Sequence, residues 1–208
     1  MKRFLVLLAT AIAGGCAVGV KHPYHDVAAE LKYPVRGTIA LAVHDRRPDV
    51  VTGVKSESFA GVQRGGYGNP FDVVTESGQP LAKEFQNAIA GALTRAGAKV
   101  VRVDVGPTVQ PVEARRQLVA TGANKSVLLT LQEWRVDSYI NVNLDHDVLL
   151  TILGPQGQVL ATGGLKGADR IASSAINPVA ASIEAVRPAY RRKLEELFAT
   201  PAVANALR

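Results

Sequence analysis

The residue with the clearest chemistry is Cys16, the only cysteine among 208 residues. Three small residues, Ala13-Gly14-Gly15, stand directly before it, and an apolar run over positions 4–13 follows the positively charged Lys2 and Arg3. A positive start, a short apolar core and small residues at the cleavage point are typical of a secretory signal peptide. A cysteine directly after such a site suits a signal peptidase that cleaves before a lipid-modified cysteine. The pattern therefore predicts that Cys16 carries a lipid.

Two alternatives to lipidation remain open. Ala13 stands where leucine is commonest, so ordinary cleavage after Ala11 or Ala13 is the first alternative. The second is a buried core thiol at Cys16, which would require the apolar leader to stay in the folded domain. The leader is too short to cross a bilayer, because a membrane-spanning helix needs about 20 apolar residues.

Three His-Asp pairs suggest metal or acid/base chemistry, namely His25-Asp26, His44-Asp45 and His146-Asp147. Neighbouring residues on a strand point to opposite faces, so the second and third pairs cannot act as units within one strand. Asp145 and Asp147 share a face, and two carboxylates at that spacing could hold a hard cation. Alternation of polar and apolar residues there is more typical of the wet side of an antiparallel sheet. We therefore predict solvated carboxylates, no metal site, and a core position for His146.

No residue has the surroundings of a catalytic nucleophile. Ser173-Ser174 lacks the Gly-x-Ser-x-Gly elbow of the α/β-hydrolases. The glycine-rich stretch at 65–68 lacks the Lys-Ser/Thr ending of a phosphate-binding loop. The sequence therefore predicts no catalytic residue, no cofactor and no enzyme.

Three aromatic residues, Phe59, Tyr67 and Phe71, lie in a long segment over 50–78 that is predicted to be irregular. Long loops inside a domain are often functional. Exposed aromatic side chains on glycine-rich backbone favour partner binding, so we predict that these three residues form a partner-binding loop. The alternative is that they fold back on the core. Trp134 is expected to pack under a helix.

The remaining chain shows regular patterns. Strands are predicted over 38–43 and 98–103, from 127 onward, and over 142–153 and 158–165. Helices are predicted over 80–96 and 111–121 and from 177 onward, where Pro188 is expected to kink or split the last helix. The sequence thus predicts an α+β fold: a mixed, mainly antiparallel sheet with helices packed on one face.

The predicted organisation is a signal peptide over 1–15, a lipidated tether over 16–36, a single α+β periplasmic domain over 37–200, and a tail over 201–208. Removing Lys2 and Arg3 with the signal peptide lowers the formal charge from +6 to +4. The remaining basic residues are scattered, which is typical of a solvated surface. We therefore expect no nucleic-acid partner.

The layout resembles the YajG-like family of Gram-negative envelope lipoproteins. The resemblance rests on the turn Asp45-Arg46-Arg47, a helix ending near Arg95-Ala96-Gly97, and the paired strands over 127–163. The chain departs from short family members by its extended segment over 50–78. The resemblance implies an envelope lipoprotein, in a family whose biochemistry is poorly defined.

The predicted function is a non-enzymatic lipoprotein, held in the outer membrane by the lipid on Cys16 and facing the periplasm. It would contact an unknown envelope protein through its sheet edge or the segment over 50–78. Ala17 favours the outer membrane, since the usual inner-membrane retention signal places aspartate there. The alternatives are a periplasmic small-ligand or glycan-binding domain, including an enzyme, and an accessory lipoprotein of a transport or surface-polymer assembly system.

Overall fold

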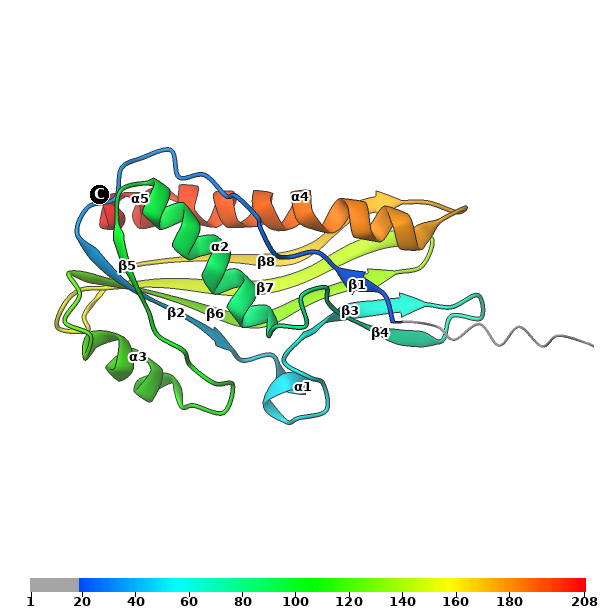
Figure 1. The fold of residues 1–208 in the computed structure, drawn as a ribbon, viewed down its shortest axis with the longest axis horizontal. Helices are drawn as coiled ribbons and strands as arrows, with labels where there is room; N and C mark the ends of the chain where they lie inside the picture. Colours follow the sequence, from blue (N-terminus) through cyan, green and yellow to red (C-terminus); the bar gives the residue numbers. More distant parts are fainter. Residues whose placement is uncertain (1–18) are drawn as a thin grey trace, which may run out of the picture.

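The computed structural model describes residues 19–208 as eight strands and five helices (Figure 1). The predicted signal peptide and Cys16 lie outside the described residues. The strands are β1 Lys21–His22, β2 Thr38–Asp45, β3 Phe59–Arg64, β4 Pro70–Thr75, β5 Lys99–Arg102, β6 Lys125–Ser138, β7 Asn141–Leu153 and β8 Val159–Ser173. The helices are α1 Pro48–Val51, α2 Leu81–Arg95, α3 Pro111–Val119, α4 Pro178–Ala199 and α5 Pro201–Leu207.

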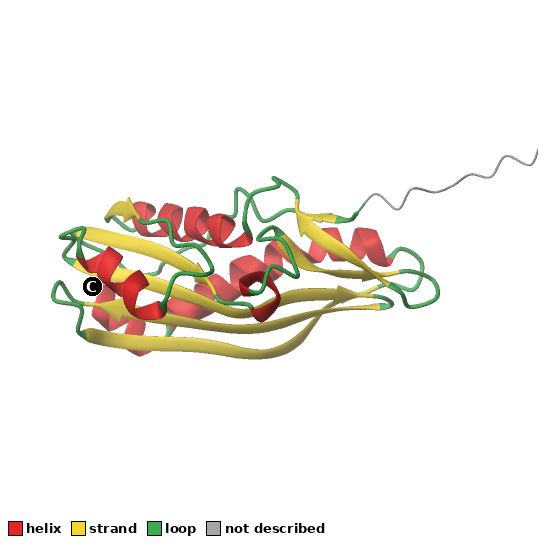
Figure 2. Ribbon diagram, turned by 90° about the horizontal axis from the view of Figure 1, so that it is seen from below, coloured by secondary structure: helices red, strands yellow, loops and turns green. Residues whose placement is uncertain are grey.

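Strands β6, β7 and β8 form the antiparallel meander that the sequence predicts. Figure 2 shows that these long strands curve along their length. In β7 the even-numbered residues from Val142 to Ile152 are buried, whereas Asn143, Asp145 and Asp147 are only partly buried. The sheet is mixed, because β2 and β3 both join β6 in parallel.

A β-bulge in β6, between Leu131 and Glu133, shifts the alternation of its side chains by one residue. Before the bulge the odd-numbered residues Leu129 and Leu131 enter the core, and after it the even-numbered Trp134 and Val136 do. A bulge places two residues of one strand opposite one residue of its partner. It therefore lets both halves of β6 contribute to the same core.

Helices α2, α4 and α5 cover one side of the sheet (Figure 1). Their core contains an aromatic cluster in which the ring of Phe85 lies 4.9 Å from Trp134 and 4.6 Å from Tyr190, both edge to face. A smaller core lies under α3, on the other side, where Leu118 packs near Leu128. The predicted α+β class and the burial of Trp134 under helices are confirmed, and α3 adds cover on the second face.

Helix α4 runs unbroken through Pro188, so the expected split does not occur. Proline removes the amide that would bond the carbonyl four residues earlier, which belongs to Glu184. Both residues are exposed, so water can satisfy that carbonyl.

The prediction of an irregular segment over 50–78 is wrong, because β3 and β4 form a hairpin within the sheet. Its glycine-rich stretch is the turn between the two strands. Gly61 hides the pattern, since its φ of +155° suits glycine and a Cβ there would collide with the backbone of Val136. Only glycine allows β3 to approach β6 this closely.

The described part of the predicted tether is also packed rather than free. Strand β1 pairs with β4, and Tyr24, Val27, Tyr33 and Val35 are buried between helices and sheet. Proline residues and weak periodicity suggested a flexible segment, but apolar side chains at irregular spacing bury it in extended form. A domain beginning at residue 37 is therefore corrected to one that includes residues 19–36.

The predicted tail over 201–208 is likewise part of the domain. Pro201 begins α5, where its missing amide costs nothing. Val203, Ala204 and Leu207 lie on one face of this helix and are buried. Helical spacing places them together against β8, so these residues pack on the sheet and do not form a tail.

The N-terminal segment is fastened to α4 by a buried contact between His22 and Ser182, whose Nε2 and Oγ atoms lie 2.6 Å apart. Burial lowers the pKa of His22 to about 4, whereas an unfolded histidine has a pKa of about 6.5. The unfolded chain therefore binds a proton first on acidification, and this part of the stability is complete above pH 6.5 and declines toward pH 4.

We expect the protonation of His22 to lower the free energy of unfolding by about 3 kcal/mol as the pH falls from 6.5 to 4. Urea unfolding at several pH values, compared between the wild-type chain and His22→Gln, isolates the contribution. The wild-type free energy of unfolding should fall more steeply with acid than that of the variant. Parallel curves would show that His22 is not the responsible group.

Candidate interaction site

Charged side chains gather on the face of β6, β7 and β8 that the helices α4 and α5 leave uncovered. This face borders a groove of about 890 Å³, whose charged lining residues are Arg46, Glu133, Asp145, Asp147 and Lys166. Pro111, the first residue of α3, also lines the groove. A partner in it would meet both signs of charge.

Oppositely charged side chains face one another across the strands here. Arg135 Nη2 donates to Asp145 Oδ2 at 2.9 Å, and Lys166 Nζ donates to Asp147 Oδ2 at 2.6 Å. The two carboxylates considered for a cation are thus each engaged by a basic side chain. Across residues 19–208, no group of three or more His, Cys, Asp and Glu side chains is arranged to hold a metal ion.

Glu133 is a groove carboxylate with a shifted pKa. Partial burial raises the pKa of its carboxyl, and the nearby guanidinium of Arg135, at 3.9 Å, opposes that rise. Arg46 borders the same groove and donates from Nη1 to the carbonyl of Pro107 at 2.9 Å. These groups offer hydrogen-bond donors and acceptors to a polar partner.

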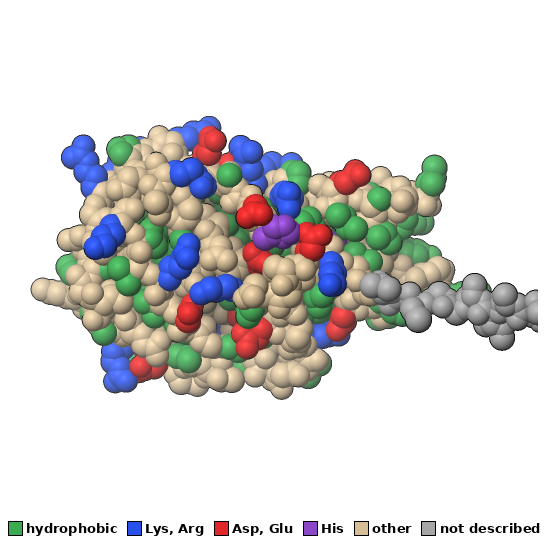
Figure 3. Space-filling model, viewed as in Figure 1, with side chains coloured by type: hydrophobic (Ala, Val, Ile, Leu, Met, Phe, Trp, Pro, Cys, Tyr) green, Lys and Arg blue, Asp and Glu red, His purple; other side chains and the backbone are tan. Residues whose placement is uncertain are grey.

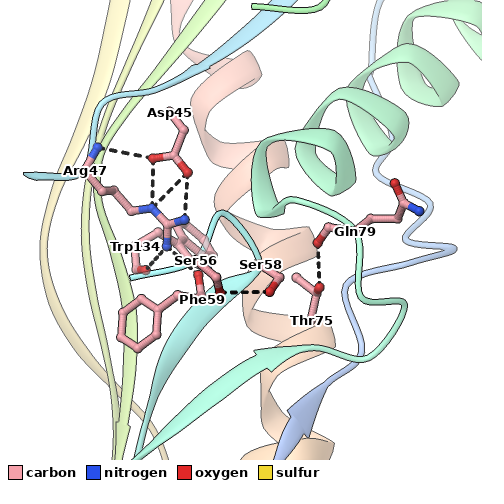
Figure 4. Close-up of polar contacts among 8 residues, drawn as sticks. All are labelled: Asp45, Arg47, Ser56, Ser58, Phe59, Thr75, Gln79 and Trp134. Atoms are coloured by element: carbon pink, nitrogen blue, oxygen red, sulfur yellow. Dashed lines mark hydrogen bonds and ion pairs between the residues drawn. The ribbon is translucent and has the colours of Figure 1, made fainter. Parts of the chain in front are cut away.

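Asp45 and Arg47 form a buried ion pair (Figure 4). Arg47 Nη2 lies 2.7 Å from Asp45 Oδ2, Arg47 Nε lies 2.9 Å from Asp45 Oδ1, and both side chains are almost fully buried. The remaining nitrogen, Nη1, donates to the carbonyl oxygens of Phe59 at 2.6 Å and Trp134 at 3.3 Å.

The position of this pair explains its contacts. Strands β2 and β3 pair with the same edge of β6, one after the other. Strand β2 pairs with β6 residues up to Leu131, and β3 pairs with β6 residues from Val136 onward. Between Leu131 and Val136, no strand within residues 19–208 pairs with that edge of β6. Arg47 fills the break and supplies the missing donor to Trp134. The Asp45–Arg47 pair therefore stabilises the sheet at this break.

The outer edge of β8 is the second notable feature of this face. The strand spans fifteen residues, and among the described residues β7 is its only pairing partner. Lys166 and Ala168 are exposed and lie opposite Asp147 and Asp145, so their side chains share the face of the groove. An unpaired strand edge presents free N–H and C=O groups to another chain.

The three aromatic residues predicted to bind a partner do not lie together. Phe59 is buried and packs with the core, which is the alternative considered for it. Tyr67, in the hairpin turn, is fully exposed, and Phe71, at the start of β4, is 40% exposed. Cys16 lies outside the described residues.

The histidines of the three predicted His-Asp pairs lie in different surroundings. His25 is half-buried, 3.6 Å from Glu76 and 3.9 Å from Asp26. Exposed ion pairs of this kind contribute little to stability. His44 is buried, and His146 is buried beside Trp134, as predicted.

Comparisons with known proteins support the fold. No family model and no curated protein matches the chain. The solved structure of protein XCC0632 from Xanthomonas campestris, described with the family model DUF330, matches with a TM-score of 0.55 and 14% identity, over 91% of this chain and 93% of that chain. This likeness shows that the two chains share an α+β fold.

Two bacterial proteins match less closely. The C-terminal domain of LpoB from Salmonella enterica has a TM-score of 0.32 and 12% identity, over 68% of this chain and 87% of that chain. Lipoprotein GNA1162 from Neisseria meningitidis has a TM-score of 0.29 and 14% identity, over 76% of this chain and 99% of that chain. Scores this low carry no functional comparison. Within residues 19–208, no helix has the length and apolar character needed to cross a membrane.

Proposed function

We propose that this chain is a lipid-anchored, non-enzymatic module of the bacterial cell envelope that binds an envelope protein through the free edge of β8. The observation that carries the proposal is that β8, a strand of fifteen residues, pairs on one side only within the described part of the chain. Peptides commonly bind by adding a strand to such an edge, where main-chain hydrogen bonds provide affinity and side chains provide specificity.

The contacts and burial of the candidate acid/base groups support a binding role. Asp45 is bonded to Arg47, and Asp147 to Lys166, so these carboxylates already have structural partners. His146 packs in the core. The signal-peptide pattern before Cys16 supports the lipid anchor, and Ala17 supports the outer membrane. Membership in the YajG-like family is part of the same proposal.

Photo-cross-linking in intact envelopes tests the edge. A photoreactive residue in place of Ala168 should give one dominant protein adduct, whereas the same residue in place of Val112, an exposed position on α3, should not. Arg170→Glu should weaken the adduct severalfold because it reverses a charge on β8. Arg115→Glu, the same change at an exposed site on α3, should leave it unchanged. Equal adducts from Ala168 and Val112 would contradict the proposal.

A second candidate function is favoured by the groove itself. Its volume of about 890 Å³ falls within the range of about 300–1,000 Å³ found for small-molecule sites. Its mixed charges suit a glycan or another polar ligand. A rise in melting temperature with envelope saccharides that is lost in Lys166→Ala, together with no adduct at β8, would favour this function.

A further inference from the structure

Three loops meet at the end of the sheet from which the described chain begins. They are the hairpin turn over 65–69, the β6–β7 turn at 139–140, and the connection from β8 to α4 over 174–177. Tyr139 Oη donates to the carbonyl of Gly66 at 3.4 Å, and the amide of Ser174 donates to the carbonyl of Ile140 at 2.9 Å. The three loops are therefore neighbours, and we call them the tip.

The tip carries no charged side chain, and large apolar side chains are exposed on it beside the polar Asn69 and Asn177. It exposes four large side chains: Tyr67 completely, Ile176 at 98%, Ile140 at 50% and Tyr139 at 42%. No Asp, Glu, Lys or Arg occurs in any of the three loops, although such residues make up 20% of the chain.

The nearest charges at the base of the tip cancel one another. Arg64, just before the hairpin turn, makes two hydrogen bonds to Asp137, just before the β6–β7 turn, at 2.8 and 2.5 Å. A cluster of exposed aromatic and branched aliphatic side chains with a neutral base is costly in water. The same side chains suit the boundary between lipid headgroups and acyl chains, where tyrosine is enriched.

The start of the described chain lies beside the tip (Figure 1). Strand β1 runs parallel to β4, and Gly19 lies next to the carbonyl of Asp72, close to where β4 leaves the hairpin turn. Figure 3 also shows hydrophobic side chains at this end of the molecule. Gly19 is the third residue after Cys16, so the two Cα atoms can lie about 10 Å apart at most. A lipid on Cys16 therefore brings this end of the domain to the bilayer surface.

We infer that the tip is a membrane-contacting surface whose side chains enter the interface of the bilayer that holds the lipid of Cys16. The inference rests on the lipid anchor of the proposed function. Together, anchor and tip would fix the orientation of the domain, with the groove and the edge of β8 beside the membrane instead of free to rotate. Two membrane contacts hold a protein far more firmly than one.

Thiol labelling of the lipidated protein tests whether the tip contacts the membrane. The protein is reconstituted in vesicles of phosphatidylethanolamine and phosphatidylglycerol and treated with a membrane-impermeant maleimide. Ile176→Cys and Val112→Cys introduce matched thiols, because Ile176 and Val112 are both highly exposed, the first in the tip and the second on α3. Since Cys16 is the only native cysteine, its lipidation leaves the introduced thiol as the only free one.

We expect Ile176→Cys to react about tenfold more slowly than Val112→Cys in vesicles. This ratio corresponds to a thiol that is exposed to water about a tenth of the time. The two rates should converge in urea. Equal rates in vesicles, with an unreactive wild-type chain, would overturn the tip and leave the anchor intact. A reactive wild-type chain would show that Cys16 is free, and would overturn the anchor and the inference that rests on it.

Discussion

Replacing Arg47 by methionine is expected to lower the free energy of unfolding by about 3–5 kcal/mol. The variant leaves the buried carboxylate of Asp45 without its cation and the carbonyl groups of Phe59 and Trp134 without their donor. A buried polar group that loses its partner keeps the full cost of its removal from water. Urea unfolding followed by the fluorescence of Trp134, the only tryptophan and a buried one, measures the loss.

A matched control is available on the surface. Arg64 also makes a two-bond pair, with Asp137, but its side chain is 40% exposed. Arg64→Met should cost much less than Arg47→Met, because water screens an exposed pair. Replacing both buried partners, as Asp45→Leu with Arg47→Met, should cost less than Arg47→Met alone, since no charge is left unpaired. Equal costs for Arg47→Met and Arg64→Met would contradict the role assigned to the buried pair.

Replacing Cys16 by serine is expected to move the protein from the membrane fraction to the soluble periplasm. Each buried methylene of an acyl chain contributes about 0.8 kcal/mol to membrane binding, so removal of the lipid abolishes stable anchoring. The tip alone presents only four exposed large side chains, which gives weak and reversible contact. Cell fractionation measures the change, and Ala17→Ser is a control that keeps the cysteine. Persistence of Cys16→Ser on membranes would exclude the lipid as the anchor.

The sequence predicts those parts of the fold in which local pattern and tertiary packing agree. The alternation from Val142 to Ile152 identifies a half-buried strand, and the structure confirms β7. The repeat that includes Leu81, Phe85 and Ile89 identifies one apolar helix face, and the structure confirms α2. In each case the apolar period equals the geometric period of the element.

The errors occur where a partner distant in sequence decides the structure. Strand β3 contains Gly61, which weakens the local strand pattern. The strand forms because Gly61 pairs closely with the backbone of Val136 in β6. Residues 19–36 lack periodicity because they pack as extended chain, and His22 is held by Ser182, 160 positions away. Such contacts have no signature within a short window.

The groove and the ion pairs show the same limit. The wet face of β7 is visible in the alternation around Asp145, but the basic partners Arg135 and Lys166 follow only from the registers of β6 and β8. The role of Arg47 depends on a break between two strands that share one edge. The tip depends on three loops far apart in sequence, so single aromatic residues such as Tyr67 gave only part of it.

We propose that the lipid on Cys16 anchors this domain to a membrane. Mass spectrometry of the purified, membrane-extracted protein tests it most directly, through the N-terminal peptide of the mature chain. We expect a peptide that begins at Cys16 and carries acyl groups, and no peptide from residues 1–15. A mature chain that begins after Ala11 or Ala13, or a Cys16 with a free thiol, would contradict it.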